Sequence, residues 1–97
     1  MNRPTLLNER EISDKLAEHP FWNKENDTIV REVVCANFPS VIGFLNAIAF
    51  IAEKLDHHPD LLIYGWNKLR ITISTHDKGG LTELDFLLAK QIDDIKF

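Results

Sequence analysis

Three of the four histidines in this chain of 97 residues lie near the predicted ends of helices and strands. His57 and His58 come where a long apolar helix should stop, and His76 follows an alternating strand. Two such ends meeting at one rim of a sheet would bring the three imidazoles together. Because imidazole both accepts and donates protons near neutral pH, this grouping suits a reaction that protonates one atom and deprotonates another.

Each histidine also has a purely structural interpretation. A histidine near a helix C-terminus interacts favourably with the helix dipole, which would explain one of His57 and His58 without any function. Three histidines could instead hold zinc. Adjacent residues usually point in different directions, however, and the chain has no HExxH spacing. Acid–base chemistry is therefore favoured over a metal site, and His19, which has no supporting context, is interpreted as a surface residue.

Three further residues could support such a site, and each has a structural alternative. Glu53 lies four residues before His57, so it could orient that ring if the helix continues, or simply be a solvated charge. Asp85 fits the third position of a capping box begun by Thr82, which explains it as structure. Trp66 could form the wall of a flat aromatic pocket, although core packing is the usual role of such a side chain.

The helices and strands that position these residues follow from hydrophobic spacing and turn signals. The sequence predicts helices over 8–18, from 37 or 40 to about 56, and from Thr82 onward, with strands over 22–24, 28–36, 61–66 and 68–75. The order α-β-β-α-β-β-α predicts an α+β fold: one domain over 1–97, with a four-stranded antiparallel sheet and helices packed on one face. Residues 1–7 are expected to form a loose arm. In the last helix, the predicted apolar stripe comprises Leu84, Leu87, Leu88 and Ile92.

The helix before His57 is apolar around most of its circumference. One face carries Val41, Phe44, Leu45, Ile48, Ala52 and Leu55, and Ile42, Ala49, Phe50 and Ile51 widen it. Such a helix is normally buried on more than one side, so a partner subunit is expected to cover what the sheet cannot. The apolar stretch 38–52 is interrupted by polar residues and is shorter than the ~18 residues of a membrane span.

The composition argues against several classes of partner. The formal net charge is −4, and the basic residues are scattered, so neither nucleic acid nor an anionic membrane is expected to bind. The single cysteine, Cys35, lies in an apolar run and predicts a buried, inert thiol. This fits a reducing compartment such as the cytoplasm, and the N-terminus shows no apolar signal core.

The stretch from Glu53 to Asp85 resembles the pterin-4a-carbinolamine dehydratases. The family pattern is an acidic or basic residue, three spacers, His-His-Pro, an aromatic residue, a histidine and a later aspartate. The residues that carry it here are Glu53-Lys54-Leu55-Asp56-His57-His58-Pro59, Trp66, Ser74-Thr75-His76-Asp77, Gly79-Gly80-Leu81-Thr82 and Asp85. Family members differ by one residue between the proline and the aromatic position, which leaves open whether Tyr64 or Trp66 faces the pocket.

The resemblance implies an enzyme without metal or organic cofactor. Its substrate would be the 4a-hydroxytetrahydropterin released by aromatic amino-acid hydroxylases, so that the enzyme supports tetrahydrobiopterin recycling. His57 and His76 would be the acid–base pair, in an order that stays open, and His58 would position the substrate. The supporting residues would be Glu53, Trp66, Asp85, Thr75 and Asp77. The sheet would extend across a homodimer, and helix packing could form a homotetramer.

Two other functions compete with the enzyme. Some relatives are dimerisation cofactors of a transcription factor, so the wide apolar helix could serve a protein-interaction module or transcriptional coactivator. A pterin-site relative could also serve a molybdopterin-related or carboxylase-assembly pathway. The complete set of three histidines favours the dehydratase, because a pure binding module has no need of them.

Overall fold

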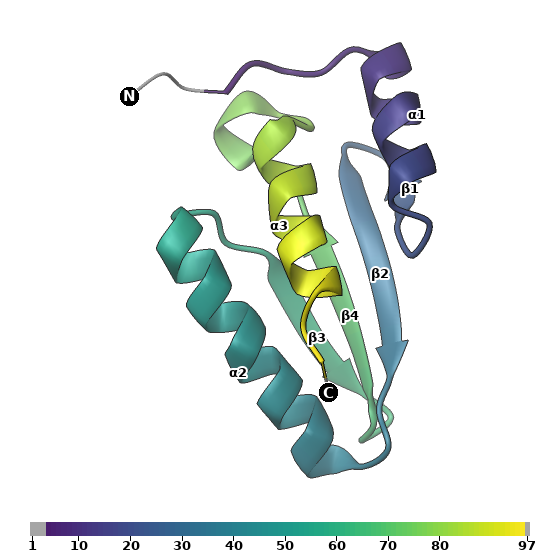
Figure 1. Ribbon diagram of the computed structural model, residues 1–97, viewed down its shortest axis with the longest axis vertical. Coiled ribbons are helices and arrows are strands. Elements are labelled where there is room, and N and C mark those ends of the chain that lie inside the picture. The colour runs from purple at the N-terminus through teal and green to yellow at the C-terminus, as the bar shows by residue number, and fades with distance from the viewer. Residues whose placement is uncertain (1–3, 97) are drawn as a thin grey trace.

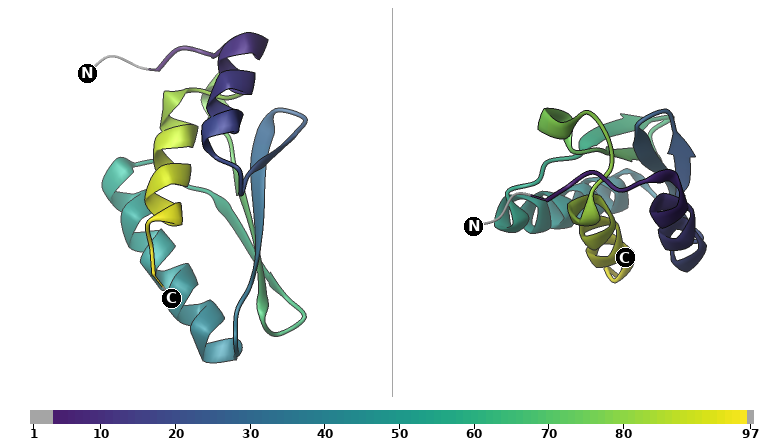
Figure 2. Two further views of the ribbon diagram at one scale, coloured as in Figure 1. Left: turned by 45° about the vertical axis from the view of Figure 1, so that its right-hand side comes forward. Right: turned by 90° about the horizontal axis from the view of Figure 1, so that it is seen from above.

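The computed structural model describes residues 4–96, in which three α-helices cover one face of a four-stranded antiparallel sheet (Figures 1 and 2). The element order is α1 (Glu9–Glu18), β1 (Asn23–Glu25), β2 (Thr28–Val34), α2 (Phe38–Leu55), β3 (Asp60–Tyr64), β4 (Lys68–Ile73) and α3 (Glu83–Asp93). A short 3-10 helix, η1 (His76–Lys78), lies between β4 and α3. The predicted α+β fold and its element order are confirmed.

The sheet has the strand order β1-β2-β4-β3, so β4 and β2 are central. Alternating residues of β4 point to opposite faces, which buries Leu69, Ile71 and Ile73 beneath the helices. The β3–β4 register pairs Asp60 with Thr72. The start of β3 and the end of β4 therefore lie at the same rim of the sheet.

The two outer helices begin as the sequence predicts, through side-chain caps. Asn8 caps α1 in a capping box with Glu11, and Asn37 caps α2 with a proline in its first turn. The predicted arm is partly attached, since the Leu7 amide donates to the Leu81 carbonyl at 2.9 Å. Residues 1–3 of that arm lie outside the described residues.

Helix α2 packs against α3 and the sheet, and α3 lies between α1 and α2 in Figure 1. The buried residues of α2 are Val41, Phe44, Ile48 and Ala52. With 18 residues and a mean hydropathy of 1.4, α2 reaches the length and composition of a membrane span, contrary to the prediction from its interrupted apolar stretch. The core helix of a globular domain meets the same criteria, and α2 contributes four residues to this core.

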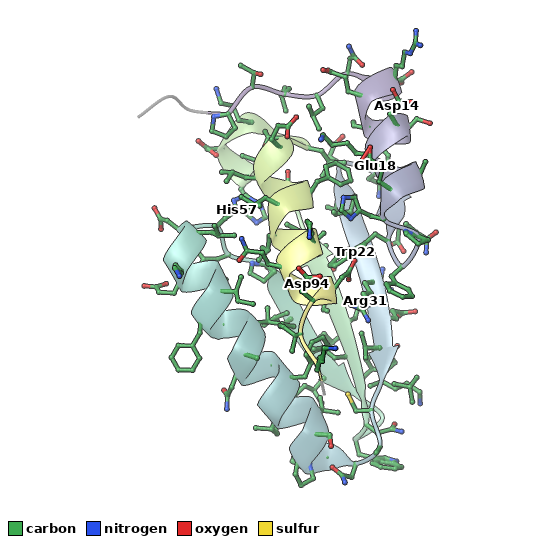
Figure 3. All side chains as sticks on the ribbon, in the orientation of Figure 1. Asp14, Glu18, Trp22, Arg31, His57 and Asp94 are labelled. Carbon is green, nitrogen blue, oxygen red and sulfur yellow. The ribbon has the colours of Figure 1, made fainter. Side chains whose placement is uncertain are left out.

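The C-terminal end of α3 is fixed to the sheet by a partly buried polar cluster. Asp93 accepts hydrogen bonds from Arg31 Nη1 at 2.6 Å and from Trp22 Nε1 at 3.0 Å. The Arg31 guanidinium also lies 4.8 Å from the ring centroid of Phe21. Figure 3 shows Trp22 and Arg31 on the β2 side of α3, opposite His57. The cluster holds α3 in place while its first turn takes part in the site described below.

Two local predictions are wrong, and one short element was not predicted. The third strand ends at Tyr64 rather than 66, because Gly65 and Trp66 adopt positive φ values of 56° and 60° and form the turn to β4. Leu87 of the predicted apolar stripe is exposed, and Phe86 and Ala89 are buried in its place. The 3-10 helix was not predicted, because its residues follow directly on an alternating strand pattern.

Candidate active site

His57 owes its position to the way α2 ends. Asp56 adopts a left-handed conformation with φ of 51°, and the His57 amide donates back to the Ala52 carbonyl at 3.0 Å. This reversal is a common way to end a helix. It turns His57 inward, where the residue is buried, while His58 stays exposed. Pro59 follows and leads the chain into β3.

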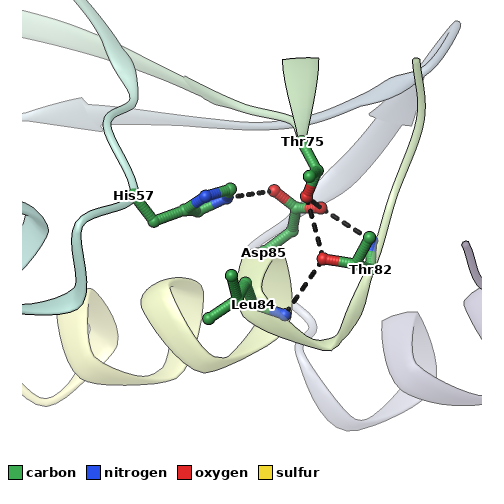
Figure 4. A network of polar contacts seen from close by, with 5 residues as sticks. All are labelled: His57, Thr75, Thr82, Leu84 and Asp85. Carbon is green, nitrogen blue, oxygen red and sulfur yellow. Dashed lines mark hydrogen bonds and ion pairs between the residues drawn. The ribbon is translucent and has the colours of Figure 1, made fainter. Parts of the chain in front are cut away.

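The inward ring meets a fully buried carboxylate (Figure 4). His57 Nε2 lies 2.6 Å from Asp85 Oδ1. Asp85 Oδ2 accepts two more bonds, from the Thr75 hydroxyl and from the Thr82 amide, both at 2.8 Å. Three elements thus converge on one carboxylate: the end of α2, the end of β4 and the first turn of α3. A buried charge with this many donors avoids most of its desolvation cost.

Asp85 therefore fills both roles that the sequence offered as alternatives. One carboxylate oxygen closes the capping box of α3 with Thr82, and the other holds His57. The capping box aims the carboxylate, because it fixes the N3 side chain against the helix N-terminus. A structural explanation of Asp85 does not compete with a functional one here.

Glu53 contacts a different histidine from the one that helical spacing predicts. Its Oε1 lies 2.9 Å from His58 Nε2, whereas His57 bonds Asp85. Of the two alternatives for Glu53, an exposed charge agrees with the structure and a contact with His57 does not, because α2 ends at Leu55 and the left-handed Asp56 turns the next residue away. The Glu53–His58 pair is exposed on both sides, so solvent weakens it.

His76 opens the 3-10 helix directly after Thr75 and is exposed. Thr75 itself is buried and forms an isolated bridge with Gly80, and this bridge closes the turn that carries His76 and Asp77. The structure thus brings His57, Thr75 and Asp85 into contact and places His76 next to them along the chain. The prediction that the end of α2 and the end of β4 meet at one rim is confirmed.

Trp66 is not brought to this rim. It lies in the turn at the far end of β3, and a strand of five residues spans roughly 17 Å at about 3.3 Å per residue. Tyr64 is at the same far end, where its hydroxyl donates to Glu32 at 3.0 Å. Within one chain, neither aromatic forms a wall beside the histidines.

The hydroxyl of Thr82 also belongs to the site, although the sequence predicted Thr82 only as a helix cap. Thr82 Oγ1 lies 2.8 Å from Thr75 Oγ1 and accepts the Leu84 amide at 3.2 Å. The capping box identified Thr82 as a helix cap, but nothing in the sequence indicated that the cap would also contact the end of β4.

Among residues 4–96, no three histidine, cysteine or acidic side chains converge as metal ligands would.

The geometry defines a class of protein: a small α+β domain with a buried aspartate–histidine pair at one rim of its sheet and two more histidines nearby. A histidine held by a carboxylate on one nitrogen can accept or give a proton on the other. Comparison with known proteins gives the family. The model of the pterin 4 alpha carbinolamine dehydratase family matches residues 5–95, and the chain belongs to that family.

Sequence relatives agree with this assignment. A protein of Chloroflexus aurantiacus, provisionally named a pterin-4-alpha-carbinolamine dehydratase, is 51% identical over 92% of this chain and 95% of its own length. A protein of Metallosphaera sedula with the same provisional name is 41% identical over 93% of both chains.

Two solved structures share the fold. The transcriptional coactivator/pterin dehydratase from Brucella melitensis superposes with a TM-score of 0.87 at 33% identity, over 92% of this chain and 96% of that one. A pterin dehydratase-like RuBisCO assembly factor of the alpha-carboxysome superposes with a TM-score of 0.59 at 19% identity, over 74% of this chain and 82% of that one. The second likeness concerns the fold alone.

Proposed function

We propose that this protein dehydrates a 4a-hydroxytetrahydropterin to a quinonoid dihydropterin and water. The C4a–O bond breaks, the hydroxyl leaves as water after taking a proton from an acid, and a base removes the proton on N5. The observation that carries the proposal is the buried Asp85, 2.6 Å from His57, in a chain of this family. The reaction involves no net oxidation, so it calls for no redox cofactor.

We assign the base to His57. When an imidazole takes a proton it becomes a cation, and the adjacent Asp85 carboxylate stabilises that cation, as in other carboxylate–histidine pairs. Because Asp85 binds Nε2, Nδ1 is the nitrogen left to receive the N5 proton. His76 then protonates the leaving hydroxyl, and its exposure lets it exchange protons with water between turnovers.

His58 is assigned to positioning the pterin. Its ring is exposed next to His57 in the chain, and the exposed Glu53 carboxylate holds it at 2.9 Å. A weakly held side chain on the surface is suited to contacting a substrate that must enter and leave. Asp77, in the turn that carries His76, belongs to the same proposed surface.

We also propose a pathway and a cell compartment for this reaction. The substrate is assigned to the biopterin recycling that follows aromatic amino-acid hydroxylation, on the strength of the family resemblance. A cytoplasmic location is assigned because the one cysteine, Cys35, is a buried free thiol, as expected in a reducing compartment.

Turnover of a freshly generated 4a-hydroxytetrahydropterin, followed by absorbance, tests the proposal. Wild-type protein should accelerate dehydration well above the uncatalysed rate, and His19→Gln, which changes the one histidine outside the site, should match it. The triple variant His57→Gln/His58→Gln/His76→Gln should lose about 10²–10⁴-fold, the usual contribution of acid–base groups. Folded wild-type protein that gives no acceleration would refute the dehydratase.

The second candidate is an interaction module, favoured by the apolar residues that α2 leaves exposed. Phe38, Ile42 and Phe50 are accessible on this helix, with Phe50 the most exposed. We propose that a second copy of the chain covers this face in a homodimer or homotetramer, and a partner protein could use the same residues. The relative from Brucella melitensis is described both as a transcriptional coactivator and as a pterin dehydratase.

Molar mass by light scattering tests the homo-oligomer. Phe50→Glu should lower the mass, whereas Leu87→Glu, on the exposed face of α3, should leave it unchanged. Phe44 and Ile48, which also belong to the apolar pattern of α2, are unsuitable because both are buried within the chain and a charge there would unfold it. A monomeric wild type, or a folded Phe50→Glu of unchanged mass, would refute the homo-oligomer.

A further inference from the structure

The Thr75 and Thr82 hydroxyls have a single consistent order of hydrogen bonds. Each hydroxyl carries one proton and can accept further bonds. Thr75 Oγ1 donates to Asp85 Oδ2 at 2.8 Å, so its proton is used there. The bond of 2.8 Å between the two threonines must then run from Thr82 to Thr75, and Thr82 Oγ1 in turn accepts the Leu84 amide.

The opposite order is unfavourable because these groups are buried. If Thr75 donated to Thr82, the Thr82 proton would have no acceptor among residues 4–96, since its other contact is an amide donor. Thr82 is 0% exposed, so no water would replace the missing bond. An unmatched buried donor costs about 1–3 kcal/mol. The chain of donors therefore runs from the Leu84 amide through both hydroxyls to Asp85.

This order bears on where the proton between Asp85 and His57 resides, because both donors act on the same carboxylate. Asp85 Oδ2 receives an N–H from Thr82 and an O–H from Thr75 and carries no proton itself. Donors to a carboxylate favour its ionised form. With an ionised Asp85, the 2.6 Å contact needs a proton on His57 Nε2, which leaves the lone pair of a neutral His57 on Nδ1.

We propose that Thr75 and Thr82 are positioning residues that hold His57 in the Nε2–H tautomer through Asp85. Neither touches the reacting atoms, because the hydroxyls of both are buried and bonded to each other. The effect on turnover rests on the proposed function, since a base at Nδ1 needs this tautomer. The tautomer itself is a property of the free protein and requires no substrate.

Thr75→Val tests the proposal, because valine keeps the shape and removes the hydroxyl. Asp85 loses one of its donors, so His57 should change from one neutral tautomer to a mixture in ¹⁵N nuclear magnetic resonance of the ring. Hydrogen bonds to charged groups are among the stronger ones, so kcat should fall about 10- to 100-fold with KM nearly unchanged. Thr75→Ser should restore both readouts. Thr72→Val, the same change on the other face of β4, should alter neither.

The ¹⁵N spectrum of the wild-type protein alone tests the tautomer of His57. A neutral His57 with its proton on Nδ1 would overturn the proposal, whether or not Thr75→Val folds. A folded Thr75→Val with the wild-type tautomer and the wild-type kcat would overturn it as well. Wild-type protein without dehydratase activity but with His57 as Nε2–H would refute the proposed function and uphold the tautomer assignment.

Discussion

His57 and His58 are neighbours in the chain, and each contacts a carboxylate, but their surroundings are opposite. In the His57–Asp85 pair the side chains are 9% and 0% exposed and the atoms are 2.6 Å apart. In the His58–Glu53 pair they are 60% and 80% exposed and 2.9 Å apart. Asp85 also accepts two further bonds, whereas among residues 4–96 the Glu53 carboxylate contacts only His58.

The difference shows how one backbone conformation separates two roles. The left-handed Asp56 turns His57 into the protein and leaves His58 at the surface. A buried pair with additional donors has a fixed geometry, because any rearrangement leaves a polar group unmatched. An exposed pair can exchange its partner for water at little cost. The first arrangement suits a proton-transfer group, and the second suits a contact that forms and breaks with substrate.

The largest expected difference between the pairs is in stability. Asp85→Asn keeps an acceptor oxygen for Thr75 and Thr82 but removes the charge and presents an amide donor to His57 Nε2, so the ring must either move its proton to Nδ1 or lose this bond. Its free energy of unfolding should fall by about 2–4 kcal/mol, measured in urea. Glu53→Gln should stay within about 0.5 kcal/mol of the wild type. Equal losses in the two variants would contradict the contrast between the pairs.

A smaller difference between the His57–Asp85 and His58–Glu53 pairs is expected in how their energies depend on salt concentration. A double-mutant cycle of Glu53→Gln and His58→Gln, measured near pH 5 where free imidazole is charged, should give a coupling of at most about 1 kcal/mol. In about 1 M salt this coupling should nearly vanish, because exposed charges are screened. The cost of Asp85→Asn should change little with salt. A Glu53–His58 coupling that survives high salt would mean that the pair is shielded, for example by a partner subunit.

The smallest effect concerns a third carboxylate, Glu32, on the open face of the sheet. Its hydrogen bond to the Tyr64 hydroxyl raises the pKa of this tyrosine above its ordinary value, with desolvation as a further cause. Glu32→Gln should lower the pKa again, measured by tyrosinate absorbance, which is clean because the chain has one tyrosine.

The linked effect on stability has a definite sign. A pKa raised by folding means that the folded state binds the proton more tightly, so this contribution is present below about pH 10 and declines as the pH rises through the tyrosine titration. In Glu32→Gln the decline should be smaller. An unchanged tyrosinate titration in that variant would show that the hydrogen bond does not persist in solution.

Local chemistry made much of this molecule predictable. The capping boxes of Asn8 with Glu11 and Thr82 with Asp85, and the alternation along β4, depend on near neighbours and appear as the sequence suggests. The partner of each histidine was not predictable, because it depends on one left-handed residue that ends α2.

The position of Trp66 was not predictable for a similar reason. Its placement depends on where the β3–β4 turn begins, and Trp66 takes a left-handed conformation that residues with a side chain seldom adopt. The contact of Thr75 with Thr82 joins two elements, the end of β4 and the cap of α3, and is visible only in the folded chain.

The most direct test of the central claim is kcat for dehydration of a 4a-hydroxytetrahydropterin by His57→Gln and His58→Gln, two variants with the same chemical change at adjacent positions. The buried pair as catalytic base predicts a loss of about 10²–10⁴-fold in kcat for His57→Gln. Because His58 is assigned to positioning the pterin, His58→Gln should mainly raise KM. A folded His57→Gln that keeps the wild-type kcat would contradict the account.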